Sequence, residues 1–309
     1  MERENWTSRL GFILAASGSA IGLGNIWRFP FITGTNGGAI FILIYLAAIL
    51  FIGYPILVSE MSLGRITAKN PIGAFKKMAP DSAWPLVGAL GVLSGFVILS
   101  YYSVVAGWGM SYIFKSFSFT AESNFPAIFG SHISSLAEPI IWHGIFMFLT
   151  IAVIGAGVVN GIQKLVKVLM PILFVIIFLL IIRSVTLEGA GAGLSFYLKP
   201  DFSAITFQTF ADAISQAFFT LSLGMGAMIT YGSYLSKKES INESAGYVLI
   251  FDTAVALLAG FAIFPAVFAF GLDPASGPGL TFITLPAVFT QMPFGTFFSI
   301  IFFLLLTIA

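Results

Sequence analysis

The sequence predicts an all-α membrane protein that crosses the bilayer several times. Of its 309 residues, 58% are hydrophobic and only 9% are charged, whereas a soluble domain carries about 25% charged residues. The apolar residues lie in runs of about 20, the length that a helix needs to cross the hydrocarbon core. A net charge of +1 argues against nucleic-acid binding. With no cysteine and two histidines, the chain excludes thiolate and histidine-cluster metal sites.

Eight apolar runs qualify as spans, and the loops between them carry unequal positive charge. The expected spans cover roughly residues 10–35, 38–63, 85–114, 140–158, 165–184, 207–235, 244–270 and 295–309. On the side of the N-terminus lie Arg3, Arg9, Arg65, Lys69, Lys76, Lys77, Lys164, Lys167, Lys237 and Lys238; on the other side lie Lys115, Arg183 and Lys199. The positive-inside rule therefore predicts a cytoplasmic N-terminus in a cell inner (plasma) membrane. Residues 71–78 are expected to form a short amphipathic helix on the cytoplasmic surface.

The first span, 10–35, is interrupted by glycines at positions 18, 22 and 24, next to Asn25. Glycine is unfavourable inside a helix. Backbone that leaves a helix within the hydrocarbon layer is tolerated only where it is buried in protein or lines a cavity. The interruption therefore predicts a site for a small charged ligand. Close packing of two helices through Gly18-x-x-x-Gly22 is the alternative, and a dinucleotide loop fails because no strand precedes it.

The sixth span, 207–235, has a second interruption at residues 222–226. Two interrupted spans in one chain are typical of a transporter site, where half-helix N-termini attract an anion and freed carbonyls hold a cation. Asp252 is the only acid in the apolar part of the seventh span, which makes it a candidate functional residue. Contact with water at the cytoplasmic end of the span is the alternative for Asp252. Glu60 in the second span is expected to satisfy buried backbone.

The eighth span has 15 residues. A helix of that length falls short of the hydrocarbon core of about 30 Å. The expectation is therefore that the sequence is an incomplete protein. A natural half-span buried against other helices is the alternative.

Several motifs together resemble the neurotransmitter:sodium symporter family. They are Trp6-x-x-Arg9-Leu10-Gly11, the run from Gly18 to Pro30, Asn36-Gly37-Gly38, Pro55, Glu60, Gly64-Arg65, Tyr101-Tyr102, the run from Gln216 to Gly226, and the run from Phe282 to Ala287. The resemblance covers the whole chain and is strongest to bacterial amino-acid carriers. It implies a leucine-transporter-type inverted-repeat bundle of twelve helices, with helices 1 and 6 unwound at the midplane. Helices 1–7 and part of helix 8 would be present, as one transmembrane domain over 1–309 with a first repeat at about 10–184 and a partial second repeat at about 207–309.

The resemblance also implies two sodium sites. Site 1 corresponds to Ala20, Asn25 and Thr220, with Asp252 at the position of the helix 7 ligand. Site 2 corresponds to Gly18, Ile21 and Ala309. A fixed carboxylate at Asp252 could replace the charge that chloride supplies in chloride-dependent relatives, so chloride independence is expected, and proton counter-transport is compatible with it.

For the substrate, the resemblance favours an amino acid over a bare amine, because Gly22 stands where amine carriers have an aspartate. The carboxylate would meet the amides of Leu23 and Gly24 and the Tyr102 hydroxyl. The residues expected around the substrate are Ser19, Ala20, Gly22, Leu23, Gly24, Ile98, Tyr102, Phe219, Thr220, Ser222 and Met225. Methionine adapts to varied apolar groups, which favours a hydrophobic or aromatic L-amino acid.

The gates follow from the same resemblance. Arg28 would close the outer side, with Asp212 and Gln216 as local candidates for contact. Arg3, Trp6 and Tyr234 match the inner gate. We therefore expect a sodium-coupled amino-acid symporter working by alternating access, and not an enzyme, since no nucleophile–base arrangement is visible. A membrane receptor that binds without transport, or a truncated transporter remnant, is the alternative.

Overall fold

The computed structural model describes residues 9–236, 238–275 and 279–308, and every regular element within these ranges is helical. The side chains of residues 9–12, 19 and 158–160 lie outside the description. Five helical segments are long and apolar enough to cross a membrane: Ala39–Thr67, Trp84–Ser118, Glu138–Gly155, Gly161–Val185 and Ile241–Ala269. A multi-pass membrane protein is the architecture that these lengths and compositions support.

The expected spans correspond to helices, and two of them, the first and the sixth, are interrupted by non-helical residues at 21–22 and 221–226. The first is α1 (Arg9–Ala20), the π-helical turn η1 (Gly24–Arg28) and α2 (Phe29–Thr35). The second is α3 (Ala39–Ala48), η2 (Ile49–Gly53) and α4 (Tyr54–Thr67). The third to fifth are α6 (Trp84–Lys115), α8 (Glu138–Gly155), and η4 (Val158–Gln163) with α9 (Lys164–Val185). The last three are α11 (Phe207–Thr220) with α12 (Ala227–Gly232), α13 (Ile241–Ala269) and α15 (Gly295–Ile308).

The predicted surface helix is α5 (Pro71–Met78). Asn70 caps it, because its Oδ1 accepts a hydrogen bond from the Gly73 amide at 2.7 Å, and proline at the first helical position suits that role. Ala74 is buried while Lys76 and Lys77 are exposed. The helix is therefore amphipathic, as the sequence predicts.

Short elements that the sequence pattern does not predict connect the long helices. They are η3 (Ser116–Ser118), α7 (Phe125–Ser134), α10 (Ala190–Leu198), η5 (Phe202–Ala204), η6 (Leu280–Thr284) and α14 (Leu285–Thr290). Local chemistry starts some of them: Asn124 Oδ1 accepts from the Ala127 amide at the beginning of α7. Most of their stability comes from packing on the long helices, since helices shorter than about 12–15 residues are marginal alone.

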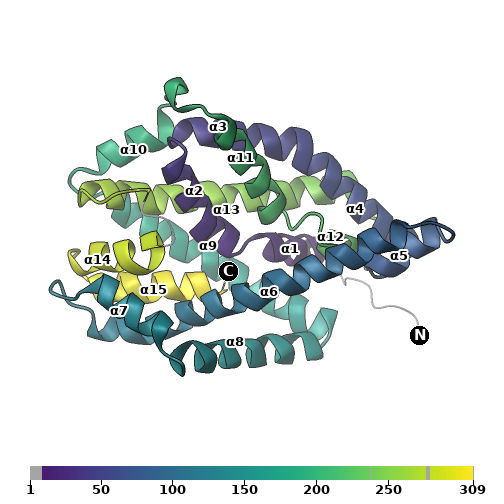
Figure 1. Ribbon diagram of the computed structural model, residues 1–309, viewed down its shortest axis with the longest axis horizontal. Coiled ribbons are helices and arrows are strands. Elements are labelled where there is room, and N and C mark those ends of the chain that lie inside the picture. The colour runs from purple at the N-terminus through teal and green to yellow at the C-terminus, as the bar shows by residue number, and fades with distance from the viewer. Residues whose placement is uncertain (1–8, 237, 276–278, 309) are drawn as a thin grey trace.

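The helix α13 lies at the centre of the bundle and packs against α1, α9 and α10 (Figure 1). Glycines bring other helices unusually close. A Cβ added to Gly64 of α4 would lie 2.0 Å from the Ile229 carbonyl oxygen of α12, and one added to Gly232 would lie 2.5 Å from the Met61 oxygen. Such close backbone approach is the usual means of helix association in membranes. It fixes α12, and with it the second interruption, against α4.

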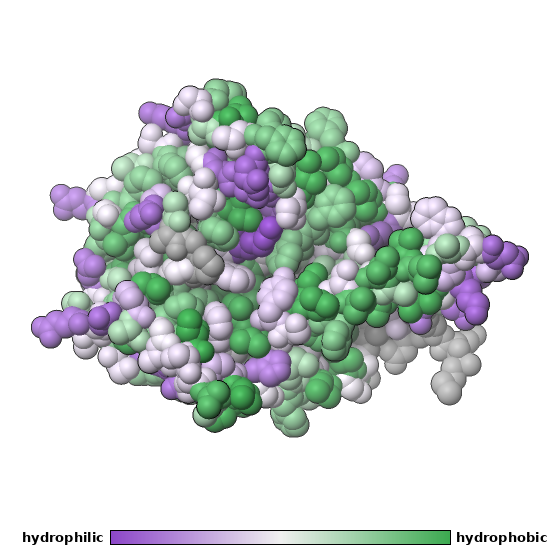
Figure 2. All heavy atoms as spheres, in the orientation of Figure 1, coloured by the Kyte–Doolittle hydropathy of each residue, from purple (hydrophilic) through white to green (hydrophobic). Residues whose placement is uncertain are grey.

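The surface agrees with a membrane setting. Figure 2 shows apolar residues over much of one face, with many of the hydrophilic residues at the two ends of the long axis. Large apolar side chains are exposed along α6 and α8, among them Phe96 and Phe148. A soluble protein rarely exposes apolar surface on this scale, so lipid is the solvent that this surface fits.

Candidate substrate and sodium site

The first interruption frees backbone amides that side chains then bind. The last regular bond of α1 runs from the Ile21 amide to the Ser17 oxygen at 2.6 Å. The Gly22 amide donates instead to Asn25 Oδ1 at 2.9 Å, and the Leu23 amide donates to the Tyr102 hydroxyl at 2.7 Å. An unsatisfied amide would cost several kcal/mol at membrane depth. Asn25 and Tyr102 therefore stabilise the break itself.

The second interruption covers residues 221–226, between α11 and α12. Ser222, Gly224 and Gly226 have positive φ angles of 54°, 79° and 78°, a conformation that glycine adopts at little cost. The Gly224 amide donates to Glu60 Oε1 at 2.7 Å. Glu60 thus binds backbone of the second interruption, as predicted, although Gly224 itself is exposed.

Three polar side chains meet between the two interruptions. Asp252 Oδ1 accepts hydrogen bonds from Asn25 Nδ2 at 2.8 Å and from Thr220 Oγ1 at 2.9 Å. Asn25 Nδ2 also donates to the Asp252 carbonyl oxygen at 2.9 Å. Asn25 and Asp252 are 0% exposed and Thr220 is 1% exposed. The alternative that Asp252 contacts water at the end of its helix is therefore wrong.

The second oxygen of this carboxylate, Oδ2, is buried and has no hydrogen-bond partner among the described residues. Burying an unpaired carboxylate costs several kcal/mol, and a bound cation is one way to offset that cost. The neighbouring Thr220 hydroxyl and Asn25 amide oxygen are hard ligands, as a small alkali cation requires. The donor set therefore fits sodium.

Arg28 is held by α11 on one side of this cluster. Its guanidinium donates to Gln216 Oε1 at 2.5 Å and to Ser215 Oγ at 2.9 Å, and lies 4.9 Å from the centre of the Phe219 ring. Gln216 in turn donates from Nε2 to the Gly24 oxygen at 2.9 Å. Gln216 thus links the arginine to the first interruption.

The other predicted partner of Arg28 is differently engaged. Asp212 accepts hydrogen bonds from Asn36 Nδ2 at 3.0 Å and from Gln208 Nε2 at 2.8 Å. Asp212 forms no ion pair with Arg28 within the described part of the chain. Of the two local candidates for contact, Gln216 binds Arg28 directly, whereas Asp212 interacts with the guanidinium through its charge while its carboxylate accepts from two amides.

A cavity of about 270 Å³ lies beside the first interruption. Its lining consists of Ala20, Gly24, Gly95, Ile98, Leu99, Tyr102, Phe219, Ser222, Met225 and Ala227. This volume lies just below the range of about 300–1,000 Å³ that is usual for small-molecule sites, so it suits a small ligand of the size of one amino acid. The Phe219 ring closes over Gly24, where an added Cβ would lie 3.1 Å from ring carbon Cδ1.

Seven predicted substrate residues line this cavity, and three lining residues were missed. On α6, Gly95 lies three residues before Ile98, and Leu99 lies one residue after it. The helical spacing 95, 98, 99 and 102 therefore carries the signal that would have found them. Ala227, the first residue of α12, carries no such signal.

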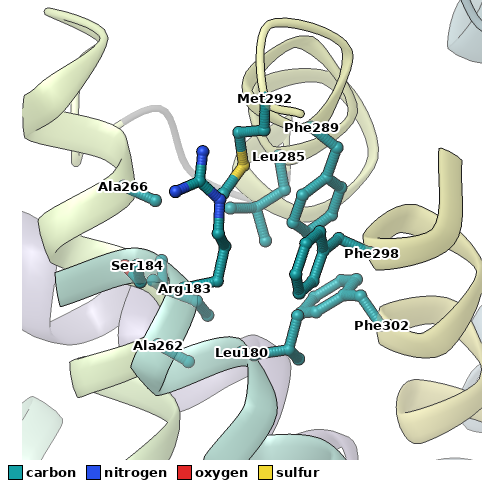
Figure 3. Close-up of a pocket in the computed structure, with 11 residues that line it drawn as sticks. Leu180, Arg183, Ser184, Ala262, Ala266, Leu285, Phe289, Met292, Phe298 and Phe302 are labelled. Carbon is teal, nitrogen blue, oxygen red and sulfur yellow. The ribbon is translucent and has the colours of Figure 1, made fainter. Parts of the chain in front are cut away.

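Other cavities are weaker candidates. The cavity at Arg183, between α9, α13 and α14 (Figure 3), measures about 10 Å³, which is room for about one water molecule. A cavity of about 260 Å³ on α5 and α6 is lined by Glu60, Pro71 and Gly224. This cavity contains none of the Asn25, Thr220 and Asp252 cluster.

Some predicted residues lie elsewhere. Arg3, Trp6 and Ala309 lie outside the described residues, as does the side chain of Ser19. A Cβ added to Gly18 would lie 3.0 Å from Val166 Cγ1 of α9. Gly18 therefore allows close packing of two helices, which was the alternative role considered for it. Ile21 is buried, and Tyr234 follows the end of α12.

Comparison with known proteins agrees with this architecture. The model of the family described as "Sodium:neurotransmitter symporter family" matches residues 3–124 and 130–309. The uncharacterized sodium-dependent transporter YhdH of Bacillus subtilis is 48% identical over 299 residues, which is 96% of this chain and 66% of the relative. An uncharacterized sodium-dependent transporter of Haemophilus influenzae is 40% identical over 322 residues, 100% of this chain and 70% of the relative.

Among solved structures, a crystal structure of MhsT in complex with L-phenylalanine matches with a TM-score of 0.93 and 48% identity, covering 99% of this chain and 71% of that chain. The predicted all-α fold is confirmed by this match. The inverted repeat and its boundaries stay a prediction. The chain spans about two thirds of the length of the Bacillus subtilis relative.

Proposed function

Because the chain belongs to the sodium:neurotransmitter symporter family, we propose that the protein is a sodium-coupled symporter that imports a neutral, hydrophobic or aromatic L-amino acid. The observation that carries this proposal is the buried Asp252 carboxylate, whose Oδ1 binds Asn25 and Thr220 and whose Oδ2 has no partner within the described ranges. A cation bound there would offset the cost of the buried charge. It would also join residues of both interruptions.

In this proposal sodium site 1 consists of the Ala20 carbonyl, Asn25 Oδ1, Thr220 Oγ1 and Asp252 Oδ2. Asn25 Oδ1 accepts one hydrogen bond from Gly22, which leaves its second lone pair for the ion. The fixed charge of Asp252 makes chloride unnecessary. Site 2 includes the carbonyls of Gly18 and Ile21, with Ala309 as a further ligand.

The substrate carboxylate binds at the first interruption. The Tyr102 hydroxyl accepts from the Leu23 amide at 2.7 Å, so its own proton is available to donate to a carboxylate. The amide of Gly24 is a second donor. Ile98, Phe219 and Met225 then surround an apolar side chain. The MhsT structure contains L-phenylalanine, which supports an aromatic or aliphatic substrate here.

Transport also requires a gate and an orientation. We place Arg28 with Gln216 and Phe219 on the outer side of the site, where the guanidinium lies over the Phe219 ring. Release would occur on the cytoplasmic side, near Tyr234. We propose that the N-terminus lies in the cytoplasm and that the membrane is the plasma membrane, because the positive charge of the loops favours this orientation.

The test is sodium-dependent uptake of labelled L-phenylalanine by the full protein in proteoliposomes. Asn25→Ala and Thr220→Ala should each weaken the response to sodium by about tenfold or more, since each removes a ligand to a buried ion. Ser184→Ala is the matched control, because it removes a buried hydroxyl of α9 outside the site. Unchanged sodium dependence in both site variants would refute the assignment, and sodium-dependent binding without uptake would favour a receptor.

A further inference from the structure

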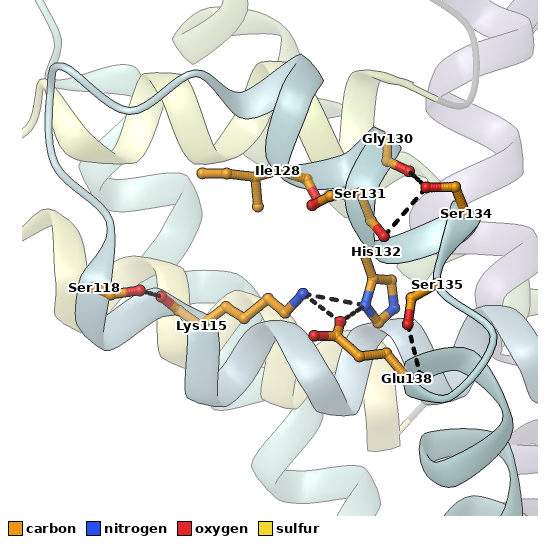
Figure 4. A network of polar contacts seen from close by, with 9 residues as sticks. All are labelled: Lys115, Ser118, Ile128, Gly130, Ser131, His132, Ser134, Ser135 and Glu138. Carbon is orange, nitrogen blue, oxygen red and sulfur yellow. Dashed lines mark hydrogen bonds and ion pairs between the residues drawn. The ribbon is translucent and has the colours of Figure 1, made fainter.

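A polar cluster outside the site joins three helices near one end of the bundle. Lys115 ends α6, His132 lies on α7 and Glu138 begins α8, and their side chains converge (Figure 4). Lys115 Nζ donates to Glu138 Oε2 at 2.6 Å and lies 3.1 Å from His132 Nδ1. His132 Nδ1 also contacts Glu138 Oε2. The His132 side chain is 0% exposed, against 24% for Lys115 and 45% for Glu138.

The geometry favours a neutral His132. When Nδ1 carries the proton, it donates to Glu138 and leaves a bare lone pair on Nε2. Nε2 is buried and has no partner among the described residues. A second proton on Nε2 would therefore be a buried donor without an acceptor, which costs about 1–3 kcal/mol or more. It would also place a second positive charge beside the Lys115 ammonium.

The titratable and charged side chains near the His132 ring come from the helices that pack against α7. Helix α6 contributes Lys115 and Tyr112, whose ring lies 6.0 Å from His132, and α8 contributes Glu138. The adjacent turn η6 has the sequence LTFIT and brings no titratable side chain. A phenol does not titrate between pH 5 and 8. Burial lowers the pKa of His132, and the contact with Glu138 opposes this only in part.

Helix α7 also forms one wall around η6. Phe129, one turn before His132, stacks on Phe282 of η6 with ring centres 5.4 Å apart and an interplanar angle of 5°. Trp108 of α6 contacts both rings, at 5.4 and 5.7 Å. Helix α7 therefore helps to hold η6, and η6 runs directly into α14.

We propose that Lys115, His132 and Glu138 form a proton-sensitive latch. With His132 neutral, the latch holds α7 on α6 and α8. Protonation of His132 in acid releases α7, and the release loosens η6 and α14 through Phe129. This function is independent of sodium and of substrate.

Hydrogen exchange measured by mass spectrometry tests the latch on the full purified protein, with rates corrected for the intrinsic effect of pH. A histidine with an ordinary pKa of about 6.5 in the open state and a lower pKa in the closed state favours opening below pH 6.5. Between pH 8 and pH 5.5 the open population of α7 should rise about tenfold. Peptides from η6 and α14 should follow, and those from α10 should not.

Two variants make the result decisive. His132→Asn replaces the titrating Nδ1 by an amide that does not titrate, so α7 should become insensitive to pH. His143→Asn removes the only other histidine and should behave as the wild type. Equal sensitivity in wild type and His132→Asn, or none in the wild type, would overturn the latch. An α7 response with unchanged η6 and α14 would overturn the coupling.

Discussion

Asp252→Asn tests whether the buried carboxylate holds sodium. The substitution keeps the size of the side chain and removes its charge. In the structure Oδ1 accepts from Asn25 at 2.8 Å and from Thr220 at 2.9 Å, while Oδ2 has no partner among the described residues. Since burying a charge costs several kcal/mol, the variant should be at least as stable as the wild type when sodium is absent.

Sodium should reverse this order. A contact with a charged group contributes about 1.5–3 kcal/mol, which is about 10- to 150-fold in a dissociation constant. At a sodium concentration of about 100 times its dissociation constant, the wild type gains about 2.7 kcal/mol of stability. A site weakened by about 100-fold gains only about 0.4 kcal/mol at the same concentration.

The assay is thermal unfolding of the purified protein in sodium gluconate and in choline gluconate, so that chloride is absent. Asp201→Asn is the matched control, because Asp201 is an exposed carboxylate bonded to Ser203. Chloride added to Asp252→Asn should restore part of the sodium response, since it returns a negative charge to the site. If Asp252→Asn keeps the full wild-type gain from sodium, the carboxylate does not hold the ion.

Three further predictions concern the site, the packing and the orientation. Tyr102→Phe leaves the Leu23 amide without its partner, so the variant should lose about 1–3 kcal/mol of stability and bind L-phenylalanine more weakly. Thermal unfolding measures the first effect and a binding assay the second. Unchanged binding would show that Tyr102 does not contact the substrate. Gly64→Ala should prevent folding or cost more than about 3 kcal/mol, because the new carbon would lie 2.0 Å from a backbone oxygen, whereas Gly144→Ala meets nothing within 4 Å and should fold normally; yield and unfolding temperature decide. Because the chain has no cysteine, Lys76→Cys and Lys199→Cys can be labelled singly, and an impermeant thiol reagent applied to intact cells should label only Lys199→Cys; the opposite result would invert the topology.

The chemistry of the site was predictable because polar residues are conspicuous in an apolar chain. Asn25 and Asp252 are costly at membrane depth unless they have partners, so each was a candidate in its own span, whereas Thr220 was a candidate only through the resemblance. Resemblance then predicted that they meet, and the structure places Asn25 Nδ2 and Thr220 Oγ1 each within 3 Å of Asp252 Oδ1. The sequence alone did not show whether Asp252 is buried or in contact with water, since that depends on which helices surround α13.

Contacts made by short elements were not predictable in the same way. Helix α7 has no long apolar period, and the convergence of Lys115, His132 and Glu138 depends on how three helix ends are placed. The role of Gln216 was visible only as one candidate beside Asp212. Both lie on α11; Gln216 contacts Arg28 directly, while Asp212 accepts a hydrogen bond from Asn36 at the end of α2.

The two interruptions also limit what a loss of function can mean. Asn25 stabilises the first interruption and also belongs to the proposed ion site. Its Oδ1 accepts a hydrogen bond from the Gly22 amide, and its Nδ2 donates to Asp252. Asn25→Ala therefore removes a structural bond together with a ligand, and its defect alone does not separate the two. Thr220 donates from Oγ1 to Asp252 and caps no backbone of the first interruption among the described residues, and Thr220→Val preserves its shape. Lost sodium dependence in Thr220→Val, with unfolding in choline unchanged to within about 1 kcal/mol, would therefore be the cleaner sign of ligation.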